Sequence, residues 1–170
     1  MTQPTLDKSK GTWFKAEDWD NLTGGLPLYR GVFLPLEQGK VQIPAPINRT
    51  PKNLPMHVHT FVDQWFVQHL GAPFRSQALY GTGNFEKAQA HAGAEGEVVL
   101  IRPNQDFTFC WSPNSYDLAG DYAQLESDDH LEQMLLEAQF NTTDLEQALL
   151  SGHEIMIISD SFTAERVLTI

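Results

Sequence analysis

Apolar residues recur along the chain with two different periods, which predicts both helices and strands. Helical spacing with capping signals at the ends predicts helices at residues 12–22, 56–71, 84–92, 130–140 and 142–152. Apolar runs rich in β-branched and aromatic residues predict strands at residues 26–36, 74–80, 97–103, 106–113, 153–160 and 162–170. Residues 41–55 contain too many prolines for a central strand, so this stretch is predicted to be an edge segment followed by a loop.

Local signals predict where two of these helices begin or end. Thr12 is the expected N-cap of the first helix, and the Gly24-Gly25 pair ends it. Near the C-terminus, Thr143 is followed three residues later by Glu146, which predicts a capping box at the last helix.

The order of the elements indicates the fold class. A tight turn at Asp160 and Ser161 joins the last two strands and predicts a closing hairpin. Helices and strands are interspersed, but the prolines and this hairpin favour an α+β fold with antiparallel or mixed sheets over a doubly wound one. A chain of 170 residues, 41% of them hydrophobic, is expected to form a single domain over residues 1–170.

Acidic residues are concentrated in the second half of a chain whose net charge is −11. Between Arg102 and Arg166 there are thirteen Asp and Glu residues and no Lys or Arg. This charge disfavours direct binding to nucleic acid. It leaves two interpretations open, a soluble acidic surface or a surface that binds a positively charged partner.

The sequence also bears on the cellular compartment. It contains no run of about 18 uncharged apolar residues, and its polar N-terminus lacks the apolar region of a secretory signal. Its only cysteine, Cys110, can form no internal disulfide, which agrees with a reducing compartment. We therefore expect a cytoplasmic protein without a membrane partner.

Polar residues occur at three places where a buried strand or a simple turn does not require them. Arg30 lies in the middle of an apolar strand and needs an anionic partner, either an internal carboxylate or a bound phosphate or carboxylate ligand. Gly31 behind it allows another backbone or a ligand to approach closely. Glu154 opens a buried strand and faces either solvent or a cleft, while Thr82 and Asn84 can cap the following helix or share its N-terminus with an anion.

The order of three short motifs resembles that of the ADP-ribosyltransferase superfamily: LYRG at 28–31, LYGTGN at 79–84 and GHEIMI at 152–157. In one branch the first strand carries Arg-Gly, the second motif a Ser or Thr and the third a Glu, matching Arg30, Thr82 and Glu154. In the diphtheria-toxin-like branch the second motif begins with a tyrosine, matched by Tyr80, and a second tyrosine lies eleven residues later, where this chain has His91.

The resemblance implies an ADP-ribosyltransferase-like fold, in which two split sheets flanked by helices hold NAD, the substrate, in a cleft. The reaction requires a cation at the pyrophosphate, an aromatic surface under the nicotinamide and a carboxylate near the ribose, where positive charge develops. The resemblance implies that Arg30, Tyr80 with His91, and Glu154 supply these groups in turn. The candidate residues are Glu154, Arg30 and Thr82 for catalysis and Arg30, Tyr80, Thr82, His91, Arg49 and Arg75 for NAD binding. We expect Arg30, Tyr80, Thr82, His91 and Glu154 to line one cleft.

The motifs do not identify the target of the implied reaction. Gly152 stands where arginine-modifying members have Glu or Gln, so the acceptor residue stays open. The middle of the chain also resembles small uncharacterised phage and prophage proteins, which implies a target in the host cell. Residues 117–137 carry seven acids and no Lys or Arg, so we expect this stretch to face a positively charged host protein.

Other functional classes are also compatible with parts of the sequence. A non-catalytic protein on the same fold could occupy a basic surface of a host protein with its acidic half. His57, His59 and Asp63 have a spacing like that of cupin metal sites, but the predicted helix places only His59 and Asp63 on one face, so no metal is expected. Cys110 lies in an apolar strand and is expected to be buried. Ser112 and Ser115 lack the Gly-x-Ser-x-Gly sequence around a hydrolase nucleophile.

Overall fold

The computed structural model describes residues 8–33, 35–46, 49–51 and 53–167. The helices are α1 Trp19–Thr23, α2 Met56–Leu70, α3 Phe74–Gln77, α4 Phe85–Ala92, α5 Leu118–Ala123, α6 Leu131–Ala138 and α7 Leu145–Ser151, with short 3₁₀ turns η1 Ala16–Asp18 and η2 Asp128–His130. The strands are β1 Tyr29–Val32, β2 Lys40–Pro44, β3 Leu79–Gly81, β4 Glu97–Pro103, β5 Phe107–Trp111, β6 Ile155–Ser159 and β7 Ser161–Arg166. No helix in this part of the chain is long and apolar enough to cross a membrane.

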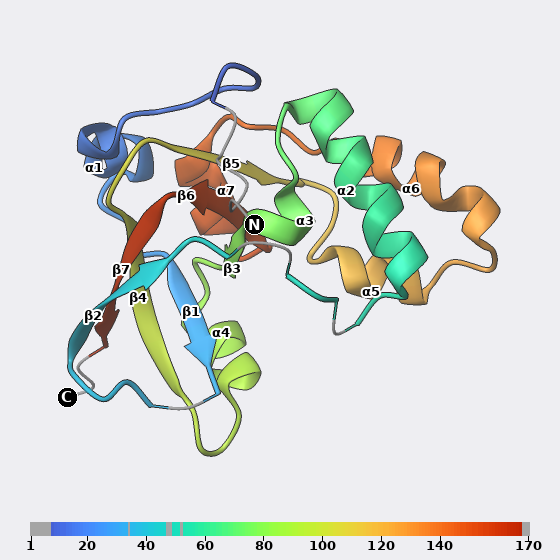
Figure 1. The fold of residues 1–170 in the computed structure, drawn as a ribbon. Helices are drawn as coiled ribbons and strands as arrows, with labels where there is room; N and C mark the ends of the chain where they lie inside the picture. The colour runs from blue at the N-terminus through green and yellow to red at the C-terminus, as the bar shows by residue number, and fades with distance from the viewer. Residues whose placement is uncertain (1–7, 34, 47–48, 52, 168–170) are drawn as a thin grey trace, which may run out of the picture.

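The strands form two antiparallel sheets, which confirms the α+β prediction (Figure 1). One sheet has the order β1-β4-β7-β2 and the other the order β3-β6-β5. The sheets meet at an isolated bridge between Tyr29 of β1 and Thr82, the residue after β3. Each of these two residues donates its backbone N–H to the carbonyl of the other, over 2.8 and 2.9 Å. The first and second sequence motifs are therefore side by side at the junction of the sheets.

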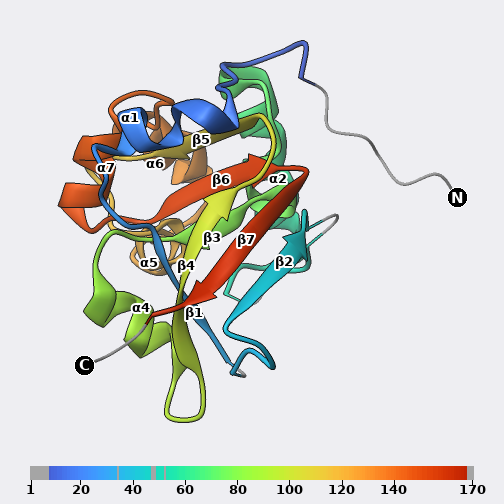
Figure 2. The same cartoon turned by 90° about the vertical axis from the view of Figure 1, so that its left-hand side faces the viewer.

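The predicted closing hairpin is wrong. β6 and β7 are separated only by Asp160, yet β6 pairs with β3 and β5, while β7 pairs with β4 and β2. Figure 2 shows the two strands diverging from this point. The chain passes from one sheet to the other over a single residue. The two strands do not pair with each other, since each has its hydrogen-bond partners in segments distant in sequence.

A buried core lies on each face of the three-stranded sheet. Side chains alternate along β6, so that Ile155 and Ile157 belong to one core and Met156 and Ile158 to the other. The first core includes α7 and the four-stranded sheet, and the second includes α2, α3 and α6. All five residues of β6 are buried, which explains its continuous apolar sequence.

α4 packs closely on β1. A β-carbon on Gly31 would lie 2.1 Å from the carbonyl oxygen of Ala88 and 2.6 Å from the backbone nitrogen of Ala92. The glycine of the first motif therefore admits the backbone of a helix, one of the two alternatives that its position in an apolar strand left open. This contact fixes α4 beside the strand that carries Arg30.

The strand predicted at 74–80 is divided into a helical turn, α3, and the short strand β3. Asp63 of α2 explains the division, because its carboxylate accepts hydrogen bonds from the backbone N–H groups of Arg75 and Ser76 over 3.0 and 3.1 Å. These bonds satisfy amide groups that the first turn of a helix leaves unpaired. A side chain twelve residues away thus overrides the local preference for a strand.

Two predicted helix caps are also wrong. The first helical turn begins at Ala16, and its N-cap Lys15 makes no side-chain capping bond, so Thr12 lies outside it. Helix α7 has Asp144 as N-cap, in a left-handed conformation with φ 59° and without a side-chain capping bond. Thr143 instead donates its hydroxyl to the side chain of Asn141 over 2.9 Å, which replaces the capping box.

Candidate functional site

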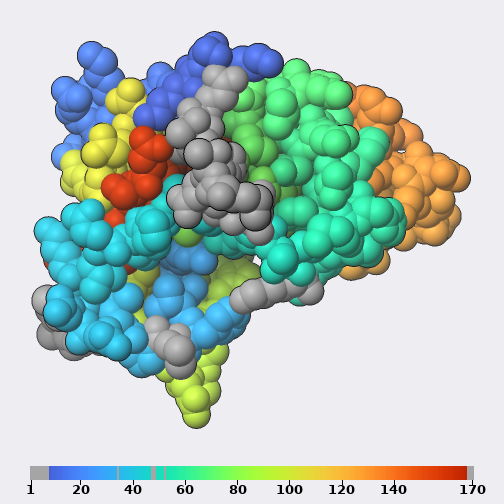
Figure 3. Space-filling view, viewed as in Figure 1, coloured from blue at the N-terminus to red at the C-terminus, as the bar shows by residue number. Residues whose placement is uncertain are grey.

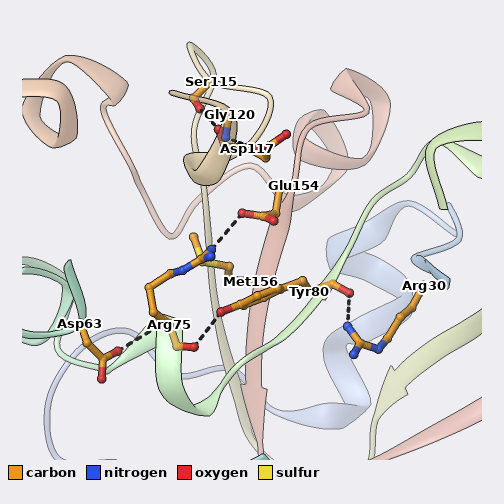
Figure 4. A network of polar contacts seen from close by, with 9 residues as sticks. All are labelled: Arg30, Asp63, Arg75, Tyr80, Ser115, Asp117, Gly120, Glu154 and Met156. Atoms are coloured by element: carbon orange, nitrogen blue, oxygen red, sulfur yellow. Dashed lines mark hydrogen bonds and ion pairs between the residues drawn. The ribbon is translucent and has the colours of Figure 1, made fainter. Parts of the chain in front are cut away.

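Arg30 on β1 reaches across the junction of the sheets. Its Nη1 donates a hydrogen bond to the backbone carbonyl of Tyr80 on β3 over 2.8 Å (Figure 4). Among the described residues, no carboxylate forms an ion pair with Arg30. Burial, with a contribution from the charge of Arg49 that exceeds the opposing effect of Tyr80, lowers the pKa of Arg30 to about 10. This guanidinium is thus a half-buried charge without an ion-pair partner in the described part of the chain.

Two further guanidinium groups surround the Tyr80 ring. The guanidinium carbon of Arg49 lies 4.4 Å from the ring centroid and that of Arg75 lies 4.6 Å from it. The Tyr80 hydroxyl donates to the backbone carbonyl of Arg75 over 2.6 Å, and burial raises the pKa of this phenol. Tyr80 therefore holds cations by contact of its ring with their planar groups. The expected role under nicotinamide stays a prediction.

Arg75 joins this cluster to Glu154. Its Nη1 lies 3.2 Å from Oε1 of Glu154, and the two side chains are only 9% and 22% exposed. Burial raises the pKa of Glu154 against the opposing effect of Arg75, and the charge of Asp117 raises it further. The backbone of Glu154 is held by its own N–H, which donates to the carbonyl of Tyr116 over 2.8 Å. Figure 4 shows the Glu154 carboxylate pointing toward the Arg75 guanidinium.

Thr82 and Asn84 form the turn that connects β3 to α4. The Thr82 hydroxyl donates to the carbonyl of Gly152 over 2.9 Å and accepts from the backbone N–H of Asn84 over 3.1 Å. The side chain of Asn84 accepts from the backbone N–H of Lys87, so it caps α4 as expected. Lys87 also donates to the Gly152 carbonyl, over 2.9 Å. Thr82 thus fixes the segment directly before Glu154, and its hydroxyl is already hydrogen-bonded.

His91 lies on the exposed surface, in the last turn of α4. It affects the cluster through its charge, which opposes the rise in the pKa of Glu154. The structure therefore brings together five of the candidate residues, Arg30, Arg49, Arg75, Tyr80 and Glu154. It places Thr82 in the adjoining turn and His91 at a more exposed position.

The three residues of the cupin-like pattern have separate roles. His57 is exposed and its Nε2 lies 2.8 Å from Oδ2 of Asp128. His59 is buried. Both carboxylate oxygens of Asp63 accept hydrogen bonds from α3, and Oδ2 accepts from the Ser76 hydroxyl over 2.5 Å. Within residues 8–33, 35–46, 49–51 and 53–167, no group of three metal-ligating side chains could hold an ion.

The serine and cysteine side chains considered as nucleophiles are occupied or buried. Ser112 donates its hydroxyl to the carbonyl of Ala138, and Ser115 donates to the carbonyl of Asp117. Cys110 is fully buried, and burial raises the pKa of its thiol well above the ordinary value. These side chains support the structure in this conformation.

Sequence reasoning missed the role of Asp63 as the anchor of the candidate site. By binding two backbone N–H groups at the start of α3, Asp63 sets the direction in which the Arg75 side chain leaves the chain. Pro73 directly before Phe74 was the available signal, since proline is frequent where a helix begins. The acidic partner itself lies in another helix and has no local signature.

The cluster carries an excess of positive charge within an acidic protein. Arg30, Arg49, Arg75 and Glu154 together carry a formal charge of +2, with the carboxylates of Asp63 and Asp117 beside them, where the whole chain carries −11. The Nε atom of Arg75 is buried and has no hydrogen-bond partner among the described residues. Figure 3 shows the surface hollowed between β1 and the start of α2. Planar cations with free donors suit phosphate or carboxylate groups.

Comparison of this chain with protein-family models, curated proteins and solved structures finds no match.

Proposed function

We propose that this protein is an NAD-dependent ADP-ribosyltransferase on an ADP-ribosyltransferase-like fold. The observation that carries the proposal is the cluster of three arginines, one tyrosine and one glutamate at the junction of two antiparallel sheets. The motifs that resemble the superfamily meet there. Arg30 lies on β1, Tyr80 on the neighbouring β3, and Glu154 directly before β6, which pairs with β3.

The donor groups of the cluster suit NAD chemically. The pyrophosphate diester of NAD is dianionic, and Arg30 and Arg49 supply two positive charges beside Tyr80. Arg30 has N–H donors beyond the one bonded to the Tyr80 carbonyl. Arg49 lies against the Tyr80 ring and forms no ion pair with a carboxylate among the residues that the structure describes. These two side chains would hold the phosphates. When bound, NAD supplies a C–N bond that breaks with the electron pair leaving on nicotinamide.

Glu154 is the group suited to the reacting end. A carboxylate in a water-poor site stabilises a developing positive charge more strongly than it does in bulk water. The exposed fraction of 22% leaves part of this side chain accessible to a substrate. Thr82 and Lys87 hold the Gly152 carbonyl and so fix the segment that carries Glu154.

We further propose that the target is a positively charged host protein. Asp117, the first acid of the acidic stretch, is close enough to influence the pKa of Glu154. From there the stretch continues along α5, η2 and α6, which Figure 1 shows extending to one side of the sheets. A partner bound along this acidic surface would therefore also reach the candidate catalytic group.

The test is release of nicotinamide from NAD by the purified protein. Replacing Glu154 by glutamine should lower turnover by about 10² to 10³ while preserving NAD affinity, since an amide cannot balance a growing positive charge. Glu165→Gln is the matched control, because Glu165 is an exposed carboxylate on β7. Equal turnover in Glu154→Gln and the control would exclude Glu154.

NAD affinity is tested separately by calorimetric titration. Arg30→Ala should weaken binding, while Arg102→Ala should not, because Arg102 is exposed and pairs with Asp20 on the surface. Unaltered affinity in Arg30→Ala would assign the phosphates to other cations. Failure of the wild-type protein to bind or consume NAD, together with tight, salt-sensitive binding to a basic host protein, would support the alternative of a non-catalytic acidic binding protein.

A further inference from the structure

Arg75 is tied to the fold by its backbone and to the cluster by its side chain. Its N–H donates to Asp63 over 3.0 Å, and its carbonyl accepts from the Tyr80 hydroxyl over 2.6 Å. These two bonds leave the side chain free to act in the site. The guanidinium lies against the Tyr80 ring and forms an ion pair with Glu154, with only 9% of the side chain exposed.

We propose that Arg75 is the positioning residue of Glu154, which orients its carboxylate, whereas Arg30 and Arg49 serve the phosphates. This inference rests on the proposed function and divides the three arginines between two tasks. Arg75 is not part of the sequence motifs that resemble the superfamily. Its assignment follows from the ion pair between α3 and the start of β6, which joins residues 79 positions apart.

The electrostatic surroundings of Glu154 make this role necessary. Burial and the charge of Asp117 favour the neutral acid, while Arg75 is the largest influence that favours the carboxylate, followed by the Leu118 backbone N–H and His91. Without Arg75, the remaining groups would raise the pKa of Glu154 further above its ordinary value. The acid would then gain its charge only at higher pH.

The surroundings include other titratable groups whose charge must be followed in any titration. Tyr80 and Arg49 both interact electrostatically with Glu154, and so does the buried thiol of Cys110. The pKa values of Tyr80 and Cys110 are raised from their ordinary values, so both stay neutral while a carboxyl group titrates. Arg49 keeps its charge over the same range.

An NMR titration of the Glu154 carboxyl carbon tests the inference without any NAD. The Glu154→Gln variant identifies the signal. Arg75→Gln should raise the titration midpoint by about 1 pH unit or more, since an adjacent arginine lowers a carboxyl pKa by about 1–3 units. Arg75→Lys should restore most of the difference, because it keeps the charge. Arg102→Gln is the control, with an expected midpoint equal to that of the wild type.

The inference is overturned if Arg75→Gln and Arg102→Gln have the same midpoint. A second measurement does not require any Arg75 variant to fold. The Arg75 side-chain nitrogen signals should shift with the midpoint of Glu154 and should lose this transition in Glu154→Gln. Nitrogen signals that do not follow Glu154 contradict the pairing, even if the Arg75 variants do not fold.

Kinetics then link the pair to the proposed reaction. In Arg75→Gln the acid limb of the kcat profile for NAD hydrolysis should move to higher pH by the same interval as the NMR midpoint, with little change in KM. Arg49→Gln should raise KM and move this limb less than Arg75→Gln does, because Arg75 is the arginine in the ion pair with Glu154. If the wild-type protein consumes no NAD, the proposed function fails, whereas the NMR titration still decides whether Arg75 controls Glu154.

Discussion

Replacement of Gly31 by alanine tests the closest contact in the scaffold of the site. The new β-carbon would lie 2.1 Å from the carbonyl oxygen of Ala88, where ordinary contact begins at 3.4 Å, a deficit of 1.3 Å (3.4 − 2.1). It would also lie 2.6 Å from the backbone nitrogen of Ala92. Both atoms belong to the helix backbone and cannot rotate away as a side chain can. Helix α4 must therefore move away from β1.

The expected loss of stability follows from this displacement. Overpacking of a close contact costs about 1–3 kcal/mol in the free energy of unfolding. The loss should be at the upper end, because a shift of α4 also loosens Ala88 and Ala92, which are 1% and 4% exposed. For a chain of this size the melting temperature falls by about 2–4 °C per kcal/mol.

Urea unfolding followed by tryptophan fluorescence measures the effect, with Gly39→Ala as the matched control. A β-carbon at Gly39 meets no atom within 4 Å, so this variant should be neutral or more stable by about 0.4–1 kcal/mol. We expect a lower midpoint for Gly31→Ala alone, with an unchanged dependence on urea. Equal midpoints for the two variants would refute the close approach of α4 to β1.

Three further predictions concern pH, thiol chemistry and docking. Hydrogen bonds from Arg166 and then from the Leu36 backbone lower the pKa of Glu97 below its ordinary value. The wild type should therefore have a higher free energy of unfolding than Glu97→Gln by a constant amount near neutral pH. This difference should disappear as the pH falls through the pKa of Glu97 in the folded protein. A difference that persists in acid would contradict this pairing. Cys110 should react with a thiol reagent only in denaturant, and rapid labelling of the native protein would show that β5 opens. If a basic protein is the target, replacing the exposed acids Asp129 and Glu132 by neutral residues should slow its modification at low salt while sparing NAD hydrolysis. Equal loss of both activities would show that these acids support the fold.

Asp128 is unsuitable for the docking test, although it belongs to the same acidic stretch. Its carboxylate accepts a hydrogen bond from the Tyr122 hydroxyl over 2.8 Å and pairs with His57 at the start of α2. Replacing it would disturb contacts between η2, α5 and α2 as well as the surface charge. The acidic composition alone does not distinguish an acid that supports the structure from one that is free to bind a partner.

Elements with strong local signals were predictable from the sequence. The helix from Met56 has apolar residues at helical spacing and ends at Gly71, which has the left-handed conformation that glycine adopts readily. Asn84 likewise caps α4 as its position suggested. Arg30 and Glu154 were recognisable because a charged side chain in or beside an apolar strand requires a partner. These features depend on residues a few positions apart.

The partners themselves were decided by tertiary structure. Apolar periodicity shows which face of an element is buried, but it does not show what covers that face. β6 and β7 are consecutive apolar strands, and only their ladders with distant strands place them in different sheets. In the same way, Asp63 turns an expected strand into α3, and this turn delivers Arg75 to a glutamate 79 positions away. The sequence determined which charged residues needed compensation, whereas long-range packing determined which of them compensate one another.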